Sequence, residues 1–446
     1  MKTSFDAIII GAGPAGSTAA ILLARAGWKV ALVEKQRFPR RKVCGECIAA
    51  SNLPLLDALG IGPRFEAAAG PALSQVALMQ GARTIVADLP PASHVRHPWG
   101  RALGRETLDT LLLAEAGKAG AVVLQPWAVQ SFAGPAGNHR CEIRAVDSAH
   151  AMTLQAPVLI AAHGSWEALP SSRSTRHLDR RASDLFAFKA NFSGATLAGG
   201  LLPVLSFDGG YGGMVVADHG ILTLACCIRR DKLDACRRAA PGMRAGEAVE
   251  AMLKRECRGV AEALRAAQPD GVWLAAGPIA PGIRLRPDED FFRIGNAAGE
   301  AHPIIGEGIS MAMQSAWLLC AELLRPDRQR DGGESQAVWQ RKVGERYAAE
   351  WQSQFAPRLR LAAAFAQMAM RPKVASPLLA LLSHWPSLLT QAARWAGKTR
   401  CTPSPATIAW LAAGAGSPNQ QNLRHKPRQA TLPSLRGRQV NRQEDS

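Results

Sequence analysis

The sequence predicts an α/β protein that opens with a βαβ unit, carries an inserted antiparallel sheet and ends in helices. Residues 5–10 and 29–34 are largely apolar runs, as strands covered on both faces of a parallel sheet require. A glycine-rich turn and an apolar helical segment at 14–26 connect them. From 183 to 230, short alternating segments are interrupted by glycines, which is typical of antiparallel strands.

The order of these patterns predicts domains that are discontinuous in sequence. Three segments are expected to build a nucleotide-binding domain: 1–70, 100–182 and 272–325. The inserted segments 71–99 and 183–271 are assigned to an antiparallel substrate domain. Helical patterns occupy 326–415, and residues 416–446, rich in Gln, Pro, Arg and Asn, are expected to form a disordered basic tail.

Composition places the chain among ordinary globular proteins, with 47% hydrophobic and 20% charged residues. The N-terminus lacks the order of a signal peptide, and no stretch offers about 20 consecutive apolar residues. We therefore expect a cytoplasmic protein whose nine cysteines are mostly free thiols. The net charge of +17 suits anionic cofactors or lipids. Without zinc-finger spacing or an RNA-binding aromatic motif, no nucleic-acid partner is expected.

A nucleotide fingerprint follows the first predicted strand, in the segment Gly11-Ala12-Gly13-Pro14-Ala15-Gly16. The first glycine makes a tight turn, the second lets a pyrophosphate approach the backbone, and the third lets helix and strand pack closely. The helix N-terminus adds amide donors and a favourable dipole for phosphates. Glu34 ends the second strand, where its carboxylate can accept hydrogen bonds from ribose hydroxyls, and Lys35 is assigned to the same site.

A second glycine motif decides which nucleotide is expected. It reads Gly295-Asn296-Ala297-Ala298-Gly299, followed by His302-Pro303-Ile304-Ile305-Gly306-Glu307-Gly308-Ile309. With the first motif, it resembles the geranylgeranyl reductases and single-component FAD monooxygenases over roughly residues 4–325. The resemblance implies a Rossmann-like FAD-binding domain of the hydroxylase type, FAD as cofactor and NAD(P)H as a transient reductant.

The same resemblance implies roles for residues of the second motif. Asn296 stands where relatives usually carry an Asp that holds the ribityl chain, and an amide can still hydrogen-bond a hydroxyl. Pro303, Gly306, Gly308 and Ile309 are expected to line the isoalloxazine. The helix that begins there points its N-terminus at the flavin, where negative charge collects on reduction.

Three further positions match the family less directly. Arg105 stands where relatives carry an arginine that reaches the FAD pyrophosphate region, although an arginine can also begin a helix for solubility. Val129 matches a position whose backbone touches the adenine. His163 replaces the usual Asp of a Gly-Ala-Asp-Gly turn. It is either a hydrogen-bonding substitute that affects nicotinamide docking or a surface histidine.

Candidate residues for the flavin side lie in two segments. Lys42-Val43-Cys44-Gly45-Glu46 resembles a loop that lies beside the flavin in geranylgeranyl reductase-like proteins, where Lys42 and the pair Arg40-Arg41 would neutralise anionic groups. Cys44 and Cys47 form a CxxC for which a disulfide or zinc is the alternative, and no metal site is expected. The cluster around Tyr211 resembles a substrate-facing strand, with a plain turn as the alternative. Catalytic candidates are therefore Cys44, Tyr211, His302 and Pro303.

Residues 352–400 contain seven Lys or Arg and no Asp or Glu. Such basic amphipathic helices either lie on an anionic membrane surface or pack over the substrate domain. A peripheral position at the inner face of the membrane is thus one expectation for this segment. Either arrangement suits a small hydrophobic substrate.

Three functions follow, and the sequence orders them. The first is an NAD(P)H-driven FAD monooxygenase that hydroxylates a hydrophobic aromatic or lipid-like substrate, since the oxidising power must come from the cofactor. The second is an FAD-dependent reductase of isoprenoid or alkene double bonds. The third is a non-catalytic flavin-binding protein. The GWWxIP-type pattern of flavin halogenases is absent.

Overall fold

The nucleotide-binding domain is built on a five-stranded parallel sheet in the computed structural model, which describes residues 2–165, 180–286, 289–325 and 335–395. In sheet order the strands are β20 (Phe292–Arg293), β12 (Val158–Ala161), β2 (Ala7–Ile10), β3 (Val30–Val33) and β8 (Val122–Leu124). The three central strands are buried along their whole length, which explains their apolar sequences. The expected α/β fold with a Rossmann-like domain is confirmed.

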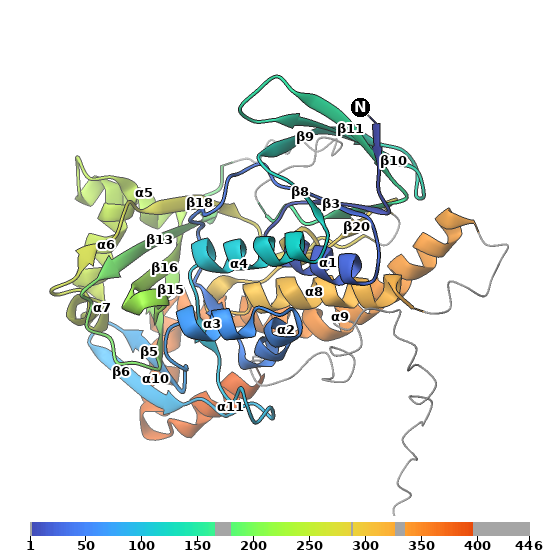
Figure 1. Cartoon of the computed structure of the whole chain (residues 1–446). Coiled ribbons are helices and arrows are strands. Elements are labelled where there is room, and N and C mark those ends of the chain that lie inside the picture. The colour runs from blue at the N-terminus through green and yellow to red at the C-terminus, as the bar shows by residue number, and fades with distance from the viewer. Residues whose placement is uncertain (1, 166–179, 287–288, 326–334, 396–446) are drawn as a thin grey trace, which may run out of the picture. The chain divides into compact units, whose positions relative to one another are not determined.

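Different layers cover the two faces of this sheet (Figure 1). Helices α1 (Pro14–Arg25), α4 (Arg105–Lys118) and α8 (Gly308–Leu323) pack together on one face. A four-stranded sheet contributes to the apolar cluster on the other face. Its strands, in order, are β1 (Lys2–Ser4), β11 (Ala151–Ala156), β10 (His139–Ala145) and β9 (Trp127–Ala133).

The second large sheet is mainly antiparallel and is formed by the inserted segments. In order, its strands are β17 (Gln268–Pro269), β13 (Leu185–Ser193), β16 (Leu222–Arg229), β15 (Gly210–Val216), β14 (Leu201–Phe207), β5 (Gln75–Gln80) and β6 (Arg83–Asp88), with β18 (Leu274–Ile279) also paired to β13. Only β14 and β5 pair in parallel among these strands. The sequence could not reveal that two separated segments share one sheet, because strand pairing is a tertiary property.

Helices α5 (Arg230–Ala239), α6 (Ala245–Glu256) and α7 (Arg258–Ala263) pack on this sheet. The helical pattern expected over 244–267 is interrupted at Cys257, whose φ of −132° and ψ of 107° are extended. Short elements connect the two domains. They are α2 (Leu53–Ala58), α3 (Gly62–Ala68), β4 (Cys47–Ile48), β7 (Arg101–Ala102), β19 (Gly282–Ile283), β21 (Gly299–Glu300), η1 (Ala50–Asn52), η2 (Asp218–Gly220), η3 (Gly295–Ala297) and η4 (Pro303–Ile305).

The C-terminal part of the described chain is helical, in α9 (Gln336–Ala369), α10 (Pro372–His384) and α11 (Ser387–Trp395). Helix α9 begins ten residues before the expected Arg346 and is capped by Ser335, whose hydroxyl accepts a hydrogen bond from the amide of Val338. Its large apolar side chains join the core of the nucleotide-binding domain, so this helix packs as one of the two expected arrangements requires. None of the helices in the described residues is both apolar and long enough to cross a membrane. The predicted tail at 416–446 lies outside the described residues.

Candidate functional site

The two glycine motifs, nearly three hundred positions apart in sequence, meet at the carboxyl edge of the parallel sheet. Gly295 has a φ of +60°, and a Cβ added there would lie 2.9 Å from the Cβ of Ala15. Gly11 has a φ of +101°, and a Cβ there would lie 2.6 Å from the carbonyl oxygen of Ala162 at the end of β12. Only glycine fits both positions. The close approach brings the N-terminus of α1 beside the second motif.

Two cavities join at this edge. One, of about 820 Å³, is lined by Gly11, Glu34, Lys35, Val129 and His163, among others. The second, of about 230 Å³, contains most of the remaining predicted positions: Pro14, Ala15, Lys42, Cys44, Arg105, Tyr211, Gly295, Asn296, His302, Pro303, Gly306, Gly308 and Ile309. Gly13, Lys42, Val43 and Ala162 line both. An extended dinucleotide fits this arrangement, with its pyrophosphate at Gly13. Of the predicted residues, only Gly16 lies in neither lining, because it packs against Gly11.

Glu34 is buried at the end of β3, where the adenosine end of a dinucleotide would lie. Its carboxylate accepts hydrogen bonds from the amide of Ala12 at 3.0 Å and the amide of Gln36 at 2.9 Å. Arg40 lies 3.8 Å from the same carboxylate. Glu34 therefore holds the first glycine turn in addition to facing the cavity, a task that the motif alone did not indicate.

Arg105 is the first residue of α4 and is buried beside the first motif. Its guanidinium donates to both carboxylate oxygens of Asp109, at 2.8 and 2.7 Å. Burial opposes the charge, but the Asp109 carboxylate outweighs it and raises the pKa of Arg105. A Cβ added at Gly13 would lie 3.6 Å from its Nη2 atom. A fixed cation thus stands next to the glycine that a pyrophosphate approaches.

Asn296 belongs to a polar network that the sequence did not reveal. Its amide donates to the hydroxyl of Ser165 at 2.9 Å, and that hydroxyl donates to the carboxylate of Glu300 at 2.9 Å. Arg284 donates to the backbone carbonyl of Asn296 at 2.7 Å and to the Glu300 carboxylate at 2.8 Å. Asn296, Ser165 and Glu300 line the smaller cavity, so an amide and two hydroxyl-binding groups face a ribityl-sized space.

Helix α8 points its N-terminus into the smaller cavity. Gly306 ends η4 in the left-handed conformation, with φ of 63° and ψ of 27°, and Gly308 begins the helix. A Cβ at Gly308 would meet no atom within 4 Å, so the cavity leaves open space at this helix end. The free amides and the helix dipole stabilise an anionic group there.

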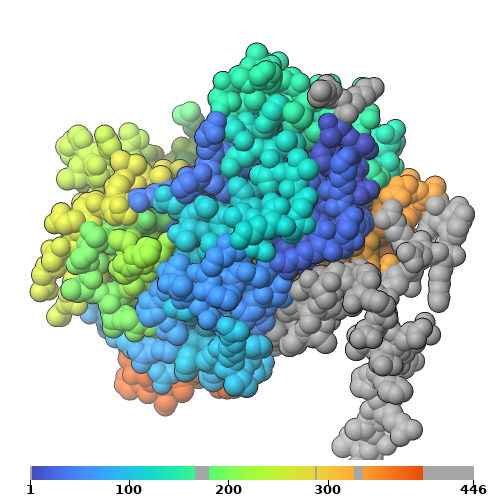
Figure 2. Space-filling model, in the orientation of Figure 1, coloured from blue at the N-terminus to red at the C-terminus, as the bar shows by residue number. Residues whose placement is uncertain are grey.

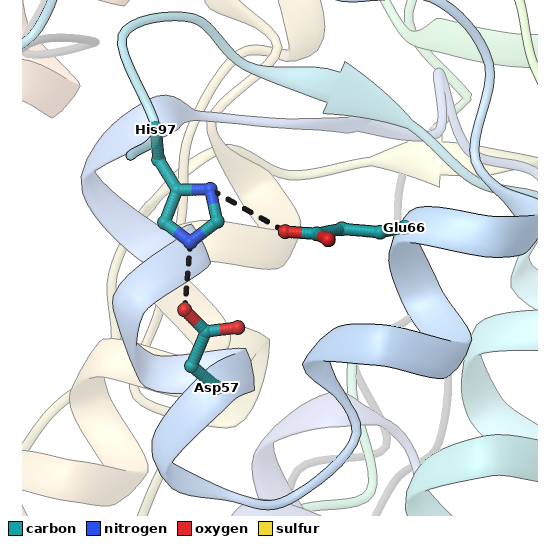
Figure 3. A group of neighbouring side chains, drawn as sticks. All are labelled: Asp57, Glu66 and His97. Carbon is teal, nitrogen blue, oxygen red and sulfur yellow. Dashed lines mark hydrogen bonds and ion pairs between the residues drawn. The ribbon is translucent and has the colours of Figure 1, made fainter. Parts of the chain in front are cut away.

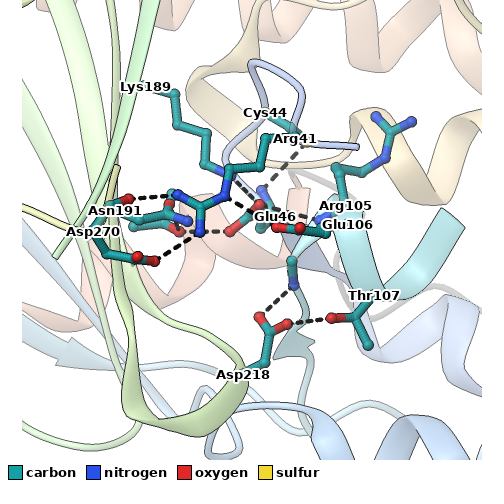
Figure 4. Close-up of polar contacts among 12 residues, drawn as sticks. Arg41, Cys44, Glu46, Arg105, Glu106, Thr107, Lys189, Asn191, Asp218 and Asp270 are labelled. Carbon is teal, nitrogen blue, oxygen red and sulfur yellow. Dashed lines mark hydrogen bonds and ion pairs between the residues drawn. The ribbon is translucent and has the colours of Figure 1, made fainter. Parts of the chain in front are cut away.

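Glu46 organises the loop that carries Cys44 (Figure 4). It is buried with a φ of +60°, and its carboxylate is paired with the buried ammonium of Lys189 from β13. The same carboxylate accepts from the hydroxyl of Thr223 at 2.5 Å and from the amide of Arg105 at 3.1 Å. A single side chain therefore connects the flavin-side loop, the substrate sheet and α4. Lys189 and Thr223 carry no motif that could have identified them.

The cysteines and arginines of this loop differ in their surroundings. Cys44 and Cys47 are both free thiols that line the smaller cavity, so the structure contains no disulfide between them. The guanidinium of Arg41 is paired with Glu106 and Asp270, each at 3.0 Å, and thereby connects α4 to the substrate domain. Arg40 lines the larger cavity. Of the two arginines, Arg40 is the better placed to neutralise a bound phosphate.

Tyr211 and His302 form the polar pair of an otherwise apolar region of the cavity. The Tyr211 hydroxyl lies 3.0 Å from Nδ1 of His302. Burial, together with the neighbouring Cys227, raises the pKa of Tyr211, and burial lowers the pKa of His302. Both groups are therefore neutral near pH 7, so the hydroxyl donates and Nδ1 accepts. Pro303 follows directly and begins η4.

His163 is partly buried in the larger cavity rather than placed on the open surface. Burial lowers its pKa to about 4, and the cations of Arg293, Arg284 and Lys42 lower it further in the same direction. A neutral imidazole therefore occupies the position where relatives carry a carboxylate. The interpretation of His163 as a surface histidine is wrong.

A separate cluster of Asp57, Glu66 and His97 places three potential metal-ligand atoms within 4.8 Å of one another (Figure 3). Nε2 of His97 lies 2.7 Å from Asp57, and its Nδ1 lies 4.0 Å from Glu66. Arg96 contacts the same two carboxylates at 3.7 and 3.2 Å. Its guanidinium already supplies the positive charge that these carboxylates need, so we assign no metal to this cluster.

The fold and the paired cavities define a class, the FAD-dependent oxidoreductases with a Rossmann-like domain and an inserted substrate sheet. The sequence comparison agrees, since residues 4–189 match the family model described as FAD binding domain. The chain is therefore a flavoprotein of the FAD binding domain family, in the group that includes flavoprotein monooxygenases.

Three curated relatives show how far the sequence similarity extends. Conditioned medium factor receptor 1 of Dictyostelium discoideum is 25% identical over 369 residues, which cover 78% of this chain and 69% of that protein. Tryptophan 2-halogenase of Chondromyces crocatus is 36% identical over 28% of this chain and 23% of its own length. Menaquinone reductase of Mycolicibacterium smegmatis is 44% identical over 14% of this chain and 15% of its own length. The latter two alignments thus span less than a quarter of those relatives.

Solved structures share the fold over nearly the whole chain. The myxobacterial chondrochloren halogenase has a TM-score of 0.67 at 18% identity, covering 92% of this chain and 97% of that chain. A geranylgeranyl bacteriochlorophyll reductase-like protein from Thermoplasma acidophilum has a TM-score of 0.64 at 18% identity, covering 93% and 96%. A probable FAD-dependent monooxygenase from Pseudomonas aeruginosa has a TM-score of 0.60 at 17% identity, covering 89% and 99%. These likenesses establish the fold.

Proposed function

We propose that this flavoprotein is an NAD(P)H-driven monooxygenase that hydroxylates a small hydrophobic substrate, either an aromatic compound or an aromatic head with a lipid-like tail. The observation that carries the proposal is the buried Tyr211–His302 pair, which stands in an apolar cavity continuous with the dinucleotide cleft. A hydroxyl backed by a neutral imidazole is suited to exchange a proton with a phenolic substrate.

The cavity wall favours an apolar ligand. Its substrate side is lined by side chains from the second sheet and from the loop before α8: Ala187, Phe188, Leu202, Pro203, Val204, Met214, Ile279 and Ile304. Polar groups are few and converge on the region of Tyr211. Pockets of this kind bind apolar molecules and use a small number of polar groups to orient them.

The residues present fit FAD from end to end. Glu34 and Val129 line the adenosine end, Gly13 and Arg105 meet at the pyrophosphate, and Asn296 faces the ribityl region. Bound FAD would accept hydride from NAD(P)H and supply the oxygen-activating chemistry, which no side chain of this cavity offers. The N-terminus of α8 would stabilise negative charge on the cofactor.

Tyr211 and His302 would move the proton. With both groups neutral, the Tyr211 oxygen can take the proton of a phenolic hydroxyl while its own proton passes to Nδ1 of His302. The transfer raises electron density on the ring, which favours attack by an electrophilic oxygen. Return of the proton restores the pair after hydroxylation.

Two thiols in the cavity are protected against oxidation. Burial raises the pKa of Cys227 to about 12 and raises the pKa of Cys226 well above its usual range. Because the thiolate is the form that oxidants attack, protonated thiols in this position are poorly reactive. An oxygen-activating reaction is therefore compatible with cysteines in the wall.

A reductase of isoprenoid or alkene double bonds is the second candidate. The loop from Lys42 to Glu46, which resembles that of geranylgeranyl reductase-like proteins, lines the same cavity as Tyr211. In such a reaction, hydride would come from reduced FAD, and the Tyr211 hydroxyl would protonate the second carbon of the double bond.

One experiment separates these candidates. The FAD-loaded protein is mixed with NADH or NADPH and with long-chain alkylphenols or geranylgeraniol, in air and under nitrogen, with ¹⁸O₂ in one arm. Monooxygenation adds one ¹⁸O atom to the alkylphenol and requires oxygen. Reduction adds two hydrogens to the alkene under nitrogen. If neither nicotinamide is consumed in any arm, both catalytic proposals fail.

A further inference from the structure

Helices α10 and α11 carry a stripe of exposed apolar side chains at helical spacing. It consists of Val374, Leu378, Leu381, Trp385 and Leu388, which are 61%, 38%, 42%, 58% and 44% exposed. Intervals of three or four residues place them on one side of consecutive helical turns. Single exposed apolar residues are ordinary, but a contiguous stripe usually marks a binding surface.

The opposite side of the same helices is anchored to the protein. Ala375, Leu379 and Leu382 are buried in a cluster with Ile85 of β6. The hydroxyl of Thr390 in α11 donates to the backbone carbonyl of Asp88 at 2.7 Å. Because the buried positions alternate with the stripe, the apolar residues of the stripe face away from the sheet to which the helices are fixed.

Basic side chains border the stripe. Arg371, Lys373 and Arg394 are exposed, and the sequence from 351 to 400 contains no Asp or Glu. Apolar residues flanked by cations on a helix surface match the interface of an anionic bilayer, where the apolar groups enter the headgroup region and the cations meet phosphates. Repulsion between these cations disfavours a second copy of the same face.

The stripe also lies near the substrate cavity. Leu389 and Ala393 of α11 pack against an apolar cluster that contains Leu89 and Leu202. These two residues line a small pocket of about 30 Å³, which shares Cys47, Leu202 and Gly306 with the larger substrate cavity. The helix that bears the end of the stripe thus covers apolar wall that continues into the cavity (Figure 2 shows the α10–α11 segment, in red, at the lower edge of the molecule).

We propose that the stripe of Val374, Leu378, Leu381, Trp385 and Leu388, with Arg371, Lys373 and Arg394 beside it, docks this protein on the surface of an anionic lipid bilayer. The docking requires no catalytic activity and stands independently of the proposed reaction. It would bring the small apolar pocket beside α11 close to membrane-dissolved molecules.

The test is co-sedimentation of the full-length, FAD-loaded protein with lipid vesicles. Vesicles of phosphatidylcholine alone are compared with vesicles that also contain phosphatidylglycerol, at low and at high salt. Three cations at about 1 kcal/mol each predict a preference on the order of 100-fold for the anionic vesicles at low salt, weakened by added salt. Equal binding to both vesicle types, or no binding to either, would overturn the proposal.

A matched pair of variants assigns the binding to the stripe. The triple variant Val374→Ser, Leu381→Ser, Trp385→Ser is expected to lose at least about 10-fold in vesicle affinity, because the buried apolar area provides most of the insertion energy. A control triple variant alters apolar residues that are exposed to a similar degree elsewhere: Val146→Ser, Met243→Ser and Val272→Ser, at 60%, 52% and 65% exposure. Unchanged FAD content shows that both variants are folded.

Two other occupants of the stripe give different results. If a second copy covers it, sedimentation velocity shows a dimer that the stripe variant converts to a monomer. If residues 396–446 cover it, the stripe variant binds vesicles as the unaltered protein does. Either result refutes membrane docking through this face.

Discussion

The hydroxyl of Tyr211 lies 3.0 Å from Nδ1 of His302, although one residue comes from strand β15 and the other precedes η4. Their rings also meet edge to face, with centroids 6.1 Å apart. The contact connects the substrate sheet to the loop that leads into α8. The pair therefore ties the position of a potential proton-transfer group to the element that would hold the flavin.

Replacement of Tyr211 by Phe is expected to reduce kcat on the order of 100-fold while FAD content stays unchanged, because the ring remains and only the proton-transferring hydroxyl is lost. The measurement is steady-state product formation from the substrate identified by the ¹⁸O₂ assay, with FAD quantified by absorbance.

The chain offers a matched control for this change. Tyr347 is its only other tyrosine, is buried, and donates to the carbonyl of Arg293 at 2.9 Å outside the two site cavities. The variant Tyr347→Phe loses a buried hydrogen bond of similar geometry and should keep its kcat. A comparable loss in both variants would mean that Tyr211 acts through stability alone.

The pH dependence of kcat should report the state of His302. Burial lowers the pKa of this imidazole below its usual 6.5. Nδ1 can accept a proton only while the ring is neutral, so activity is present above the lowered pKa and falls as pH drops through it. The expected profile therefore has an acidic limb below pH 6.5. A profile of His302→Gln that retains the same limb at reduced kcat would assign the limb to another group.

The sequence predicted those parts of the site that depend on local backbone requirements. Gly11, Gly13 and Gly295 stand where strand-to-helix turns need a left-handed residue or a close approach, and each requirement leaves a mark in the sequence. Glu34 could be predicted because it ends a strand at a fixed distance from the first motif. The contact between the two motifs was expected from the resemblance, and the structure contains it.

The polar networks could not be predicted in this way. Glu46 meets Lys189 only because the inserted sheet folds back over the loop, and the two residues are 143 positions apart. The network of Asn296, Ser165 and Glu300 likewise joins three separate segments. No periodicity or spacing records such contacts, since they depend on how domains pack.

The buried pair of Glu46 and Lys189 should behave as one unit in folding. Both side chains are only 2% exposed, so removing one partner leaves an uncompensated buried charge. We expect Lys189→Met to lower the free energy of unfolding by about 3–5 kcal/mol. The double variant Glu46→Gln, Lys189→Met should lose less than the sum of the single variants. Chemical denaturation of all four proteins measures the coupling, and strictly additive losses would show that the two charges do not stabilise each other.

Glu34 provides a prediction that separates ribose binding from support of the glycine turn. Replacement by Ala removes the acceptor of the amides of Ala12 and Gln36 and also the group that faces the adenosine end of the cleft. We expect FAD affinity to fall by about 10- to 100-fold, as for loss of hydrogen bonds to a charged group. FMN has no adenosine ribose, so its affinity, measured by flavin fluorescence with the same variant, should change much less. Equal losses for FAD and FMN would show that Glu34 acts through the turn at Ala12, and unchanged affinity for both would remove Glu34 from the nucleotide site.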